Sequence, residues 1–174
     1  IKYLEKKEID ILINNAGINR IDNFTDVKIK DFDEVYRVNL RTPLLLSQTV
    51  VPYMLTKKWG RIINISSIFG KVSKEKRASY SASKFGLDGI TAAMSAELSQ
   101  NNILVNSVGP GFISTDMTKS ILGESGIKEV EKQIPIGRLG NVKEIASLVC
   151  WLASDSNTYL TGQNIMIDGG FTRV

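Results

Sequence analysis

The chain has 174 residues, of which 43% are hydrophobic and 23% charged, a composition typical of one globular domain with a core of its own. It contains no histidine and one cysteine, which excludes histidine-based triads, histidine-ligated metals, thiolate metal clusters and intrachain disulfides, so no metal site is expected. The net charge of +4 is small and its basic residues are scattered, so we expect neither a nucleic-acid nor a membrane partner.

Short apolar runs alternate with longer segments of helical periodicity along the chain. The predicted elements, in chain order, are the end of a helix at 2–8, a strand buried on both faces within 9–17, a helical segment bent or divided by Pro43 and Pro52 at 29–58, a buried strand at 60–67, a long helix at 78–100, a strand at 102–111, short helices within 112–140, an amphipathic helix at 141–155 with Asn141 as its N-cap, and a last strand within 162–170.

Two features bear on the cellular setting. The purely apolar stretches are only a few residues long, far short of a membrane span, and the charged N-terminus does not resemble a signal peptide. We therefore expect a cytoplasmic protein. Cys150 stands in an apolar helical segment, and we expect it to pack in the core.

The alternation of strands and helices predicts an α/β fold, with a parallel sheet covered by helices on both faces. In such sheets ligands bind beyond the carboxyl ends of the strands. The residues that directly follow the strands are therefore the first candidates for a site. They are residues 14–17, 66–67 and 109–115.

A tyrosine followed four residues later by a lysine occurs three times, starting at Tyr3, Tyr53 and Tyr80. Residues four apart lie on the same face of a helix, so the motif alone does not single out one pair. Only Tyr80 follows a predicted strand that ends in a polar residue, Ser67, with one loop between them. We expect Ser67, Tyr80 and Lys84 to converge at the carboxyl edge of the sheet.

With these residues in view, nearly the whole chain resembles the short-chain dehydrogenase/reductase family. The matching motifs are NNAG after the first strand, Asn39 in the next helix, Ser67 thirteen residues before Tyr80, the Tyr80–Lys84 pair, GPGFISTDM after the third strand and LTGQNIMIDGG near the end. The family's first strand, glycine-rich turn and helix have no match. The resemblance implies the carboxyl portion of a Rossmann-type doubly wound parallel sheet, with residues 1–174 as one partial domain.

The resemblance also implies site residues and a cofactor, NADP or NAD. The implied catalytic residues are Ser67, Tyr80, Lys84 and Asn39. The implied cofactor-binding residues are Asn15, Ala16, Gly17, Tyr80, Lys84, Pro110, Gly111, Ile113 and Thr115. In carbonyl reduction, Tyr80 would donate a proton after its pKa falls from about 10 toward neutrality, because a cation such as Lys84 favours the phenolate. Ser67 would hydrogen-bond the substrate oxygen, and Asn39 would hold a water that leads to Lys84.

Three smaller expectations complete the site. By the resemblance, Asn14 ties neighbouring strands together. Gly111 is expected to be a glycine because the cofactor approaches the backbone there. The basic cluster at residues 71–77 reads either as a solvated loop or as an attractor for an anionic substrate.

The substrate class and the oligomeric state are indicated only by the family resemblance. Within the family the chain is most similar to 3-oxoacyl-acyl-carrier-protein reductases and to sugar, polyol and other secondary-alcohol dehydrogenases, which implies a small-molecule or carrier-bound carbonyl substrate. Lys57, Lys58 and Arg61 fit a basic entrance for an acidic carrier protein. The family's habit of assembly implies a homo-oligomer, a dimer or tetramer. A catalytically inactive fragment or interaction subunit is the alternative of another class.

Overall fold

The computed structural model describes residues 7–173, without the side chain of Met117. The helix expected at 2–8 falls mostly outside the described residues, as does Tyr3. The helices and strands are β1 Ile11–Asn14, α1 Ile29–Tyr36, the π-helical segment η3 Arg37–Arg41, α2 Thr42–Lys57, β2 Gly60–Ile65, α3 Ala78–Leu98, β3 Ile103–Pro110, α4 Asp116–Gln133, α5 Val142–Ala153 and β4 Asn164–Ile167. Short 3-10 turns lie at Phe24–Asp26 (η2), Ile68–Gly70 (η4), Ser99–Asn101 (η5) and Phe171–Arg173 (η6).

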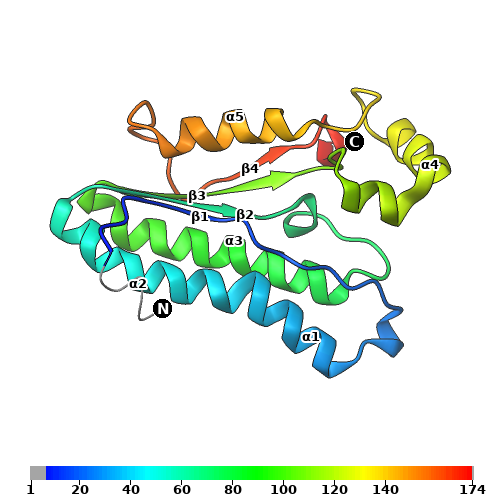
Figure 1. Ribbon diagram of the computed structural model, residues 1–174, viewed down its shortest axis with the longest axis horizontal. Coiled ribbons are helices and arrows are strands. Elements are labelled where there is room, and N and C mark those ends of the chain that lie inside the picture. The colour runs from blue at the N-terminus through cyan, green and yellow to red at the C-terminus, as the bar shows by residue number, and fades with distance from the viewer. Residues whose placement is uncertain (1–6, 174) are drawn as a thin grey trace.

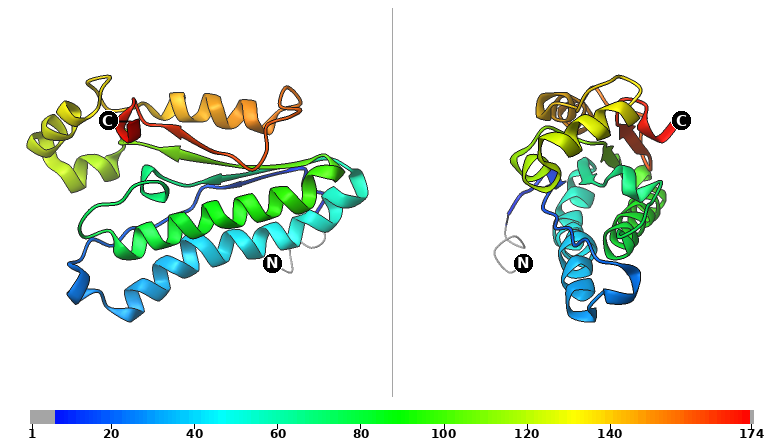
Figure 2. Two further views of the ribbon diagram at one scale, coloured as in Figure 1. Left: turned by 180° about the vertical axis from the view of Figure 1, so that it is seen from behind. Right: turned by 90° about the vertical axis from the view of Figure 1, so that its right-hand side faces the viewer.

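The four strands form one parallel sheet in the order β1-β2-β3-β4. Helices α2 and α3 cover one face of this sheet and α5 covers the other (Figure 1). Helix α1 packs against α3 beyond the carboxyl ends of the strands, and α4 lies beyond the carboxyl end of β3. The view from behind and the view along the sheet show the same layers (Figure 2). The α/β fold with a parallel sheet between helices is therefore confirmed.

The core consists of two apolar layers, one on each face of the sheet. Consecutive residues of a strand point to opposite faces, so Ile62 of β2 joins the layer under α2 and α3, and Ile63 joins the layer under α5. Both side chains are almost fully buried. The central strands thus show the two-sided burial that their continuous apolar sequence indicates.

Strand β1 departs from the expectation of burial on both faces. It lies at an edge of the sheet, and Ile11 and Ile13 are 43% and 46% exposed, whereas Leu12 packs against the core. The reason is that no described element packs on the face that carries the two isoleucines. The sequence predicts the strand correctly, but it does not predict that one face of the strand is exposed.

The helical segment at 29–58 is divided near its first proline, as expected. A π-helical segment, Arg37–Arg41, separates α1 from α2, and Pro43 occupies the first turn of α2. Proline has no N–H to donate in the regular pattern, so the ladder of hydrogen bonds changes just before it. Pro52 lies inside α2 without ending the helix.

The segment after β3 forms α4, in which Gly123 adopts a left-handed φ of 62° and separates two helical stretches. This agrees with the short helices expected there. Helix α5 starts at the expected N-cap, where the Asn141 side chain accepts from the amide of Lys143 and Glu144 completes a capping box. Among the described residues no helix is long and apolar enough to cross a membrane.

The expected burial of Cys150 is wrong, because its thiol is exposed. Helix α5 is apolar on more of its circumference than the sheet covers, and Trp151, the next residue, is also 44% exposed. Apolar neighbours in the sequence therefore did not identify the face that packs on the sheet.

Candidate active site

The loops that follow β1, β2 and β3 meet α3 at the carboxyl edge of the sheet, where they enclose two adjoining pockets. The larger, of about 280 Å³, is lined by Asn15, Gly17, Ile18, Asn19, Ile65, Ser66, Ser67, Tyr80, Lys84, Pro110, Gly111 and Thr115. The smaller, of about 140 Å³, is lined by Asn19, Ser67, Ile68, Phe69, Arg77, Tyr80, Gly111, Phe112, Thr118, Ile121 and Leu122. Ser67 and Tyr80 lie where the two pockets meet.

Ser67 lies two residues after the end of β2 and caps the turn η4, because its hydroxyl accepts from the amide of Phe69 at 3.1 Å. Its other neighbour is Tyr80 on α3. Burial raises the pKa of the Tyr80 hydroxyl above its ordinary value, while hydrogen bonding with Ser67 and the positive charge of Arg77 partly offset that rise. The expected fall of this pKa toward neutrality is therefore not found in this structure, because burial outweighs the groups that favour the phenolate. The convergence of strand-end serine and helix tyrosine agrees with the geometry expected from the sequence.

Lys84 lies one turn after Tyr80 and is only 3% exposed. Its ammonium donates to the carbonyl of Ile65 at 2.7 Å and lies 5.6 Å from the centre of the Tyr80 ring. Burial lowers the pKa of Lys84 to about 8, against an opposing effect of Asp88. An ammonium has three N–H groups, so a donor remains for a ligand in the larger pocket that Lys84 lines.

Asp88 lies one further turn along α3 and was not identified from the sequence. Its carboxylate accepts from the hydroxyl of Ser107 at 2.8 Å and from the side-chain amide of Asn164. Burial raises its pKa to about 6, although Ser107, Ser66 and Lys84 all act in the opposite direction. The spacing Tyr80, Lys84, Asp88 places all three on one helix face, and this spacing is the signal that could have revealed Asp88.

Asn39 is 1% exposed and sits in the π-helical segment between α1 and α2. Its amide donates to the carbonyl of Ile18 at 2.9 Å and to the hydroxyl of Ser83 at 3.0 Å, and its oxygen accepts from the Ile18 amide. A Cβ atom added at Gly17 would lie 3.4 Å from the Asn39 oxygen and 3.5 Å from the Lys84 ammonium. Asn39 and Lys84 therefore both lie close to the loop after β1.

The expected tie between strands is present as a buried pair of asparagines. The amide of Asn14 at the end of β1 donates to Asn64 on β2 at 2.8 Å. The amide of Asn64 donates in turn to Thr91 on α3 at 2.8 Å. This chain of hydrogen bonds fixes the two strand ends against the helix that carries Tyr80 and Lys84.

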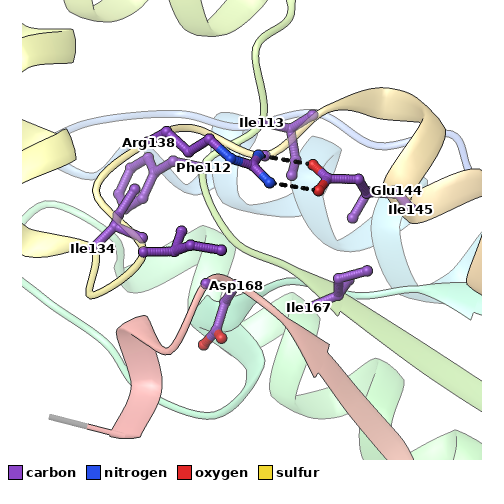
Figure 3. A pocket seen from close by; sticks show the side chains of 11 residues that line it. Phe112, Ile113, Ile134, Arg138, Glu144, Ile145, Ile167 and Asp168 are labelled. Carbon is purple, nitrogen blue, oxygen red and sulfur yellow. Dashed lines mark hydrogen bonds and ion pairs between the residues drawn. The ribbon is translucent and has the colours of Figure 1, made fainter.

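Two residues expected at the cofactor do not line the larger pocket. Ala16 is exposed beside it. Ile113 pairs with Gly140 and lines another cavity, of about 170 Å³, where it lies with Arg138, Glu144 and Phe112 (Figure 3). The loop after β3 pairs Ile113 with Gly140 and places it near the end of β4, which residue spacing alone does not reveal.

The structure gives a reason for glycine at position 111 that lies within the fold itself. A Cβ atom at this position would lie 2.8 Å from the Cα atom of Asp168. The close approach that requires glycine is therefore made by the backbone that follows β4. Gly111 lines both pockets. The lack of a side chain at this position is accounted for by its contact with Asp168.

Arg77 is the other site residue that the sequence did not single out. It precedes α3, is 9% exposed, lines the smaller pocket beside Tyr80, and its guanidinium carbon lies 5.3 Å from the centre of the Phe69 ring. The sequence indicated Arg77 only as one member of the basic cluster at residues 71–77. Its burial depends on Phe69 and on the lining contributed by α4, which sequence spacing does not give.

The basic entrance expected at Lys57, Lys58 and Arg61 is wrong for this chain. Arg61 is the second residue of β2, near the amino end of the strand, and is 2% exposed. It donates to three backbone carbonyls, those of Gly60, Asn102 and Asn157. Lys57 pairs with Asp10. These residues lie at the end of the strands opposite Ser67, so within one chain they do not flank the pockets.

Comparison with known proteins agrees with this architecture. Residues 3–172 match the family model described as Enoyl-(Acyl carrier protein) reductase. The chain belongs to the short-chain dehydrogenase/reductase family. It is 43% identical over 162 residues to the 3-oxoacyl-[acyl-carrier-protein] reductase of Aquifex aeolicus, and 44% identical over 162 residues to that of Thermotoga maritima. Each alignment covers 93% of this chain and 65% of the relative, so the chain spans about two thirds of their length.

Solved structures give the same family likeness. A protein of Beutenbergia cavernae, described as a putative NAD(P)-dependent gluconate 5-dehydrogenase with bound NADP, superimposes with a TM-score of 0.95 at 30% identity, covering 99% of this chain and 70% of that one. A gluconate 5-dehydrogenase of Burkholderia cenocepacia in complex with NADP and tartrate gives a TM-score of 0.92 at 31% identity, covering 95% and 66%.

Proposed function

We propose that the natural protein is an NAD(P)-dependent oxidoreductase that interconverts a carbonyl compound and a secondary alcohol. The observation that carries the proposal is the convergence of Ser67, Tyr80 and Lys84 on the larger pocket. A hydroxyl, a phenol and a buried ammonium in contact with one cavity supply a hydrogen-bond donor, a proton and a positive charge. When a hydride is transferred to a carbonyl carbon, the oxygen gains negative charge, which a hydrogen-bond donor and a positive charge stabilise, and it then takes up the proton.

The cofactor fits the larger pocket by the chemistry of its lining. Asn15, Gly17 and Thr115 offer small or polar contacts, and Lys84 keeps an N–H group for a ribose hydroxyl. A nicotinamide bound there supplies or accepts the hydride, which no side chain can do. The solved neighbours that carry NADP in their descriptions support this choice, and a preference between NADP and NAD is left to experiment.

Each catalytic side chain has a proposed task. The Tyr80 hydroxyl donates the proton to the substrate oxygen during reduction. The Ser67 hydroxyl donates a hydrogen bond to the same oxygen and stabilises its developing charge. Lys84 contributes its positive charge beside Tyr80, and Asn39 holds the loop after β1 in place through Ile18. The water expected between Asn39 and Lys84 stays a prediction.

The similar proteins suggest two substrate classes. The relatives at 43% and 44% identity are 3-oxoacyl-[acyl-carrier-protein] reductases, which favours a 3-oxoacyl thioester. The solved neighbours named gluconate 5-dehydrogenases favour a sugar acid, and the unpaired Arg77 beside Tyr80 is the structural observation in favour of an acid. The cytoplasmic setting and the homo-oligomer stay predictions.

The test is an assay of the natural protein for oxidation of NADPH and NADH in the presence of a 3-oxobutyryl thioester and, in the reverse direction, for reduction of NADP and NAD in the presence of gluconate. We expect turnover with at least one of these substrate classes. Absence of both cofactor binding and turnover in the natural protein would support the alternative of an interaction subunit.

A further inference from the structure

Arg77 combines burial with a lack of partners. Its side chain is 9% exposed, and the Nε and one Nη atom are buried without a hydrogen-bond partner in the part of the chain that the structure describes. The Phe69 ring covers one side of the guanidinium. A buried guanidinium loses its hydration and regains the free energy only when an acceptor replaces the water.

Arg138 provides a comparison within the same chain. Its two Nη atoms donate to the two carboxylate oxygens of Glu144 at 3.0 and 2.8 Å, in a paired arrangement that Figure 3 shows clearly. Arg77 is more buried than Arg138, yet no salt bridge of the described residues includes it. Arg61 is also buried without a carboxylate partner, but it donates to three backbone carbonyls, whereas no side-chain hydrogen bond of the described residues involves Arg77.

The residues around Arg77 indicate which kind of group would accept hydrogen bonds from its guanidinium. It is the only charged side chain among the residues that line the smaller pocket, which also holds Ser67 and Tyr80. The remaining lining is apolar or neutral. Burial lowers the pKa of Arg77, and Tyr80 and Glu75 only partly oppose this effect. Glu75 is exposed and forms no ion pair with Arg77. An anion entering beside Tyr80 would meet one positive charge and no opposing carboxylate.

We propose that the smaller pocket binds a carboxylate group of the substrate through Arg77, so that the enzyme acts on a small oxo acid or hydroxy acid. This rests on the proposed oxidoreductase function and narrows its substrate class. A guanidinium offers Nε and Nη in a planar fork that matches the two oxygens of a carboxylate. The carboxylate on Arg77 places the carbonyl of the same molecule toward Ser67 and Tyr80, which share the pocket.

The experiment compares 3-oxobutyrate with its methyl ester and its N-acetylcysteamine thioester, which share the carbonyl and differ in charge. In the natural protein we expect kcat/KM to favour the free acid. Arg77→Gln should reduce kcat/KM for the acid by about 10- to 100-fold more than for the two neutral substrates, as expected for the loss of a charge-assisted hydrogen bond. Any loss that all three substrates share reports the effect of the Arg77 charge on Tyr80. Arg77→Lys, which keeps the charge without the fork, should recover part of the loss.

Lys74→Gln is the matched control, because it removes one positive charge from the exposed part of the same loop. It should change no substrate's kcat/KM by more than about twofold, since exposed charges interact weakly. Equal losses for acid, ester and thioester in Arg77→Gln would overturn the proposal, because Arg77 would then act on Tyr80 or on the fold. A preference of the natural protein for the thioester would also overturn it.

A binding measurement that does not depend on turnover distinguishes the carboxylate site from the proposed oxidoreductase function. Saturation-transfer NMR should detect 3-oxobutyrate on the natural protein, with a weaker signal for the methyl ester, and Arg77→Gln should abolish the difference. If the acid binds through Arg77 and no substrate is reduced, the oxidoreductase function fails and the carboxylate site stands. If the neutral substrates are reduced and the acid neither binds nor reacts, the function stands and the carboxylate site is wrong.

Discussion

Lys84 and Asp88 lie one turn apart on α3, and among the described residues the Asp88 carboxylate is the only charge that raises the pKa of the buried Lys84 ammonium. Elements packed against α3 carry other charged side chains, among them Asp31, Asp33, Glu34, Arg37 and Arg41. None of these acts detectably on Lys84. The proton on the proposed catalytic lysine therefore depends on a carboxylate that does not line the pockets.

The first prediction concerns the pH dependence of activity in Asp88→Asn. Without the carboxylate, burial alone acts on Lys84 and its pKa falls below about 8. The alkaline limb of kcat/KM for carbonyl reduction should therefore move to lower pH than in the natural protein. Glu97→Gln, an isosteric change at an exposed position of the same helix, should leave the profile unchanged. An identical alkaline limb in Asp88→Asn would show that Asp88 does not control Lys84.

The second prediction concerns stability. The pKa of Asp88 is raised from 3.8 to about 6 in the folded protein, so the folded state binds more protons than the unfolded state between these values. Its contribution therefore lowers the free energy of unfolding as pH rises from about 4 to about 6. This decline should be smaller in Asp88→Asn than in the natural protein, measured by urea unfolding at a series of pH values. Parallel curves for the two proteins would rule out a raised pKa at Asp88.

The third prediction compares two glycines. In Gly111→Ala the added Cβ meets the backbone at Asp168, so the ends of β3 and β4 must shift, at a cost of about 1–3 kcal/mol in unfolding free energy. In Gly89→Ala on α3 the added Cβ has nothing within 4 Å, so the higher helix propensity of alanine should stabilise the protein by up to about 1 kcal/mol. Urea midpoints that move in the same direction for both variants would contradict this account of Gly111.

The fold was predictable from the sequence because its strands have simple signals. Buried parallel strands read as short runs of isoleucine and valine, and residues 60–65 and 103–110 fit that pattern. Because the carboxyl ends of parallel strands share one edge, Ser67 and Gly111 could be expected to meet before any coordinates were known. The order of the motifs then distinguished Tyr80 from Tyr53, which lies in α2 away from this edge.

The errors arose where a side chain's surroundings come from distant segments. Cys150 was expected in the core because its neighbours in the sequence are apolar, but it is exposed on α5. Arg61 was expected at a basic entrance because of the family resemblance, but it is buried among backbone carbonyls. Arg77 reads as part of a solvated basic loop, and only its packing against Phe69 and beside Tyr80 shows that it is buried. Hydrophobic periodicity identifies the apolar face of a helix or strand, but it does not identify which distant segments pack against that face.

The central claim is that Tyr80 is the proton donor of a carbonyl reductase. The most direct test is the kcat of the natural protein and of Tyr80→Phe for reduction of a carbonyl substrate by NADPH or NADH, with Tyr53→Phe as the control for the repeated motif. The Tyr80 variant loses only the hydroxyl, so its kcat should fall by about 10²- to 10⁴-fold, the usual contribution of a positioned proton donor. The Tyr53 variant should keep the natural rate. A kcat near that of the natural protein in Tyr80→Phe would contradict the account.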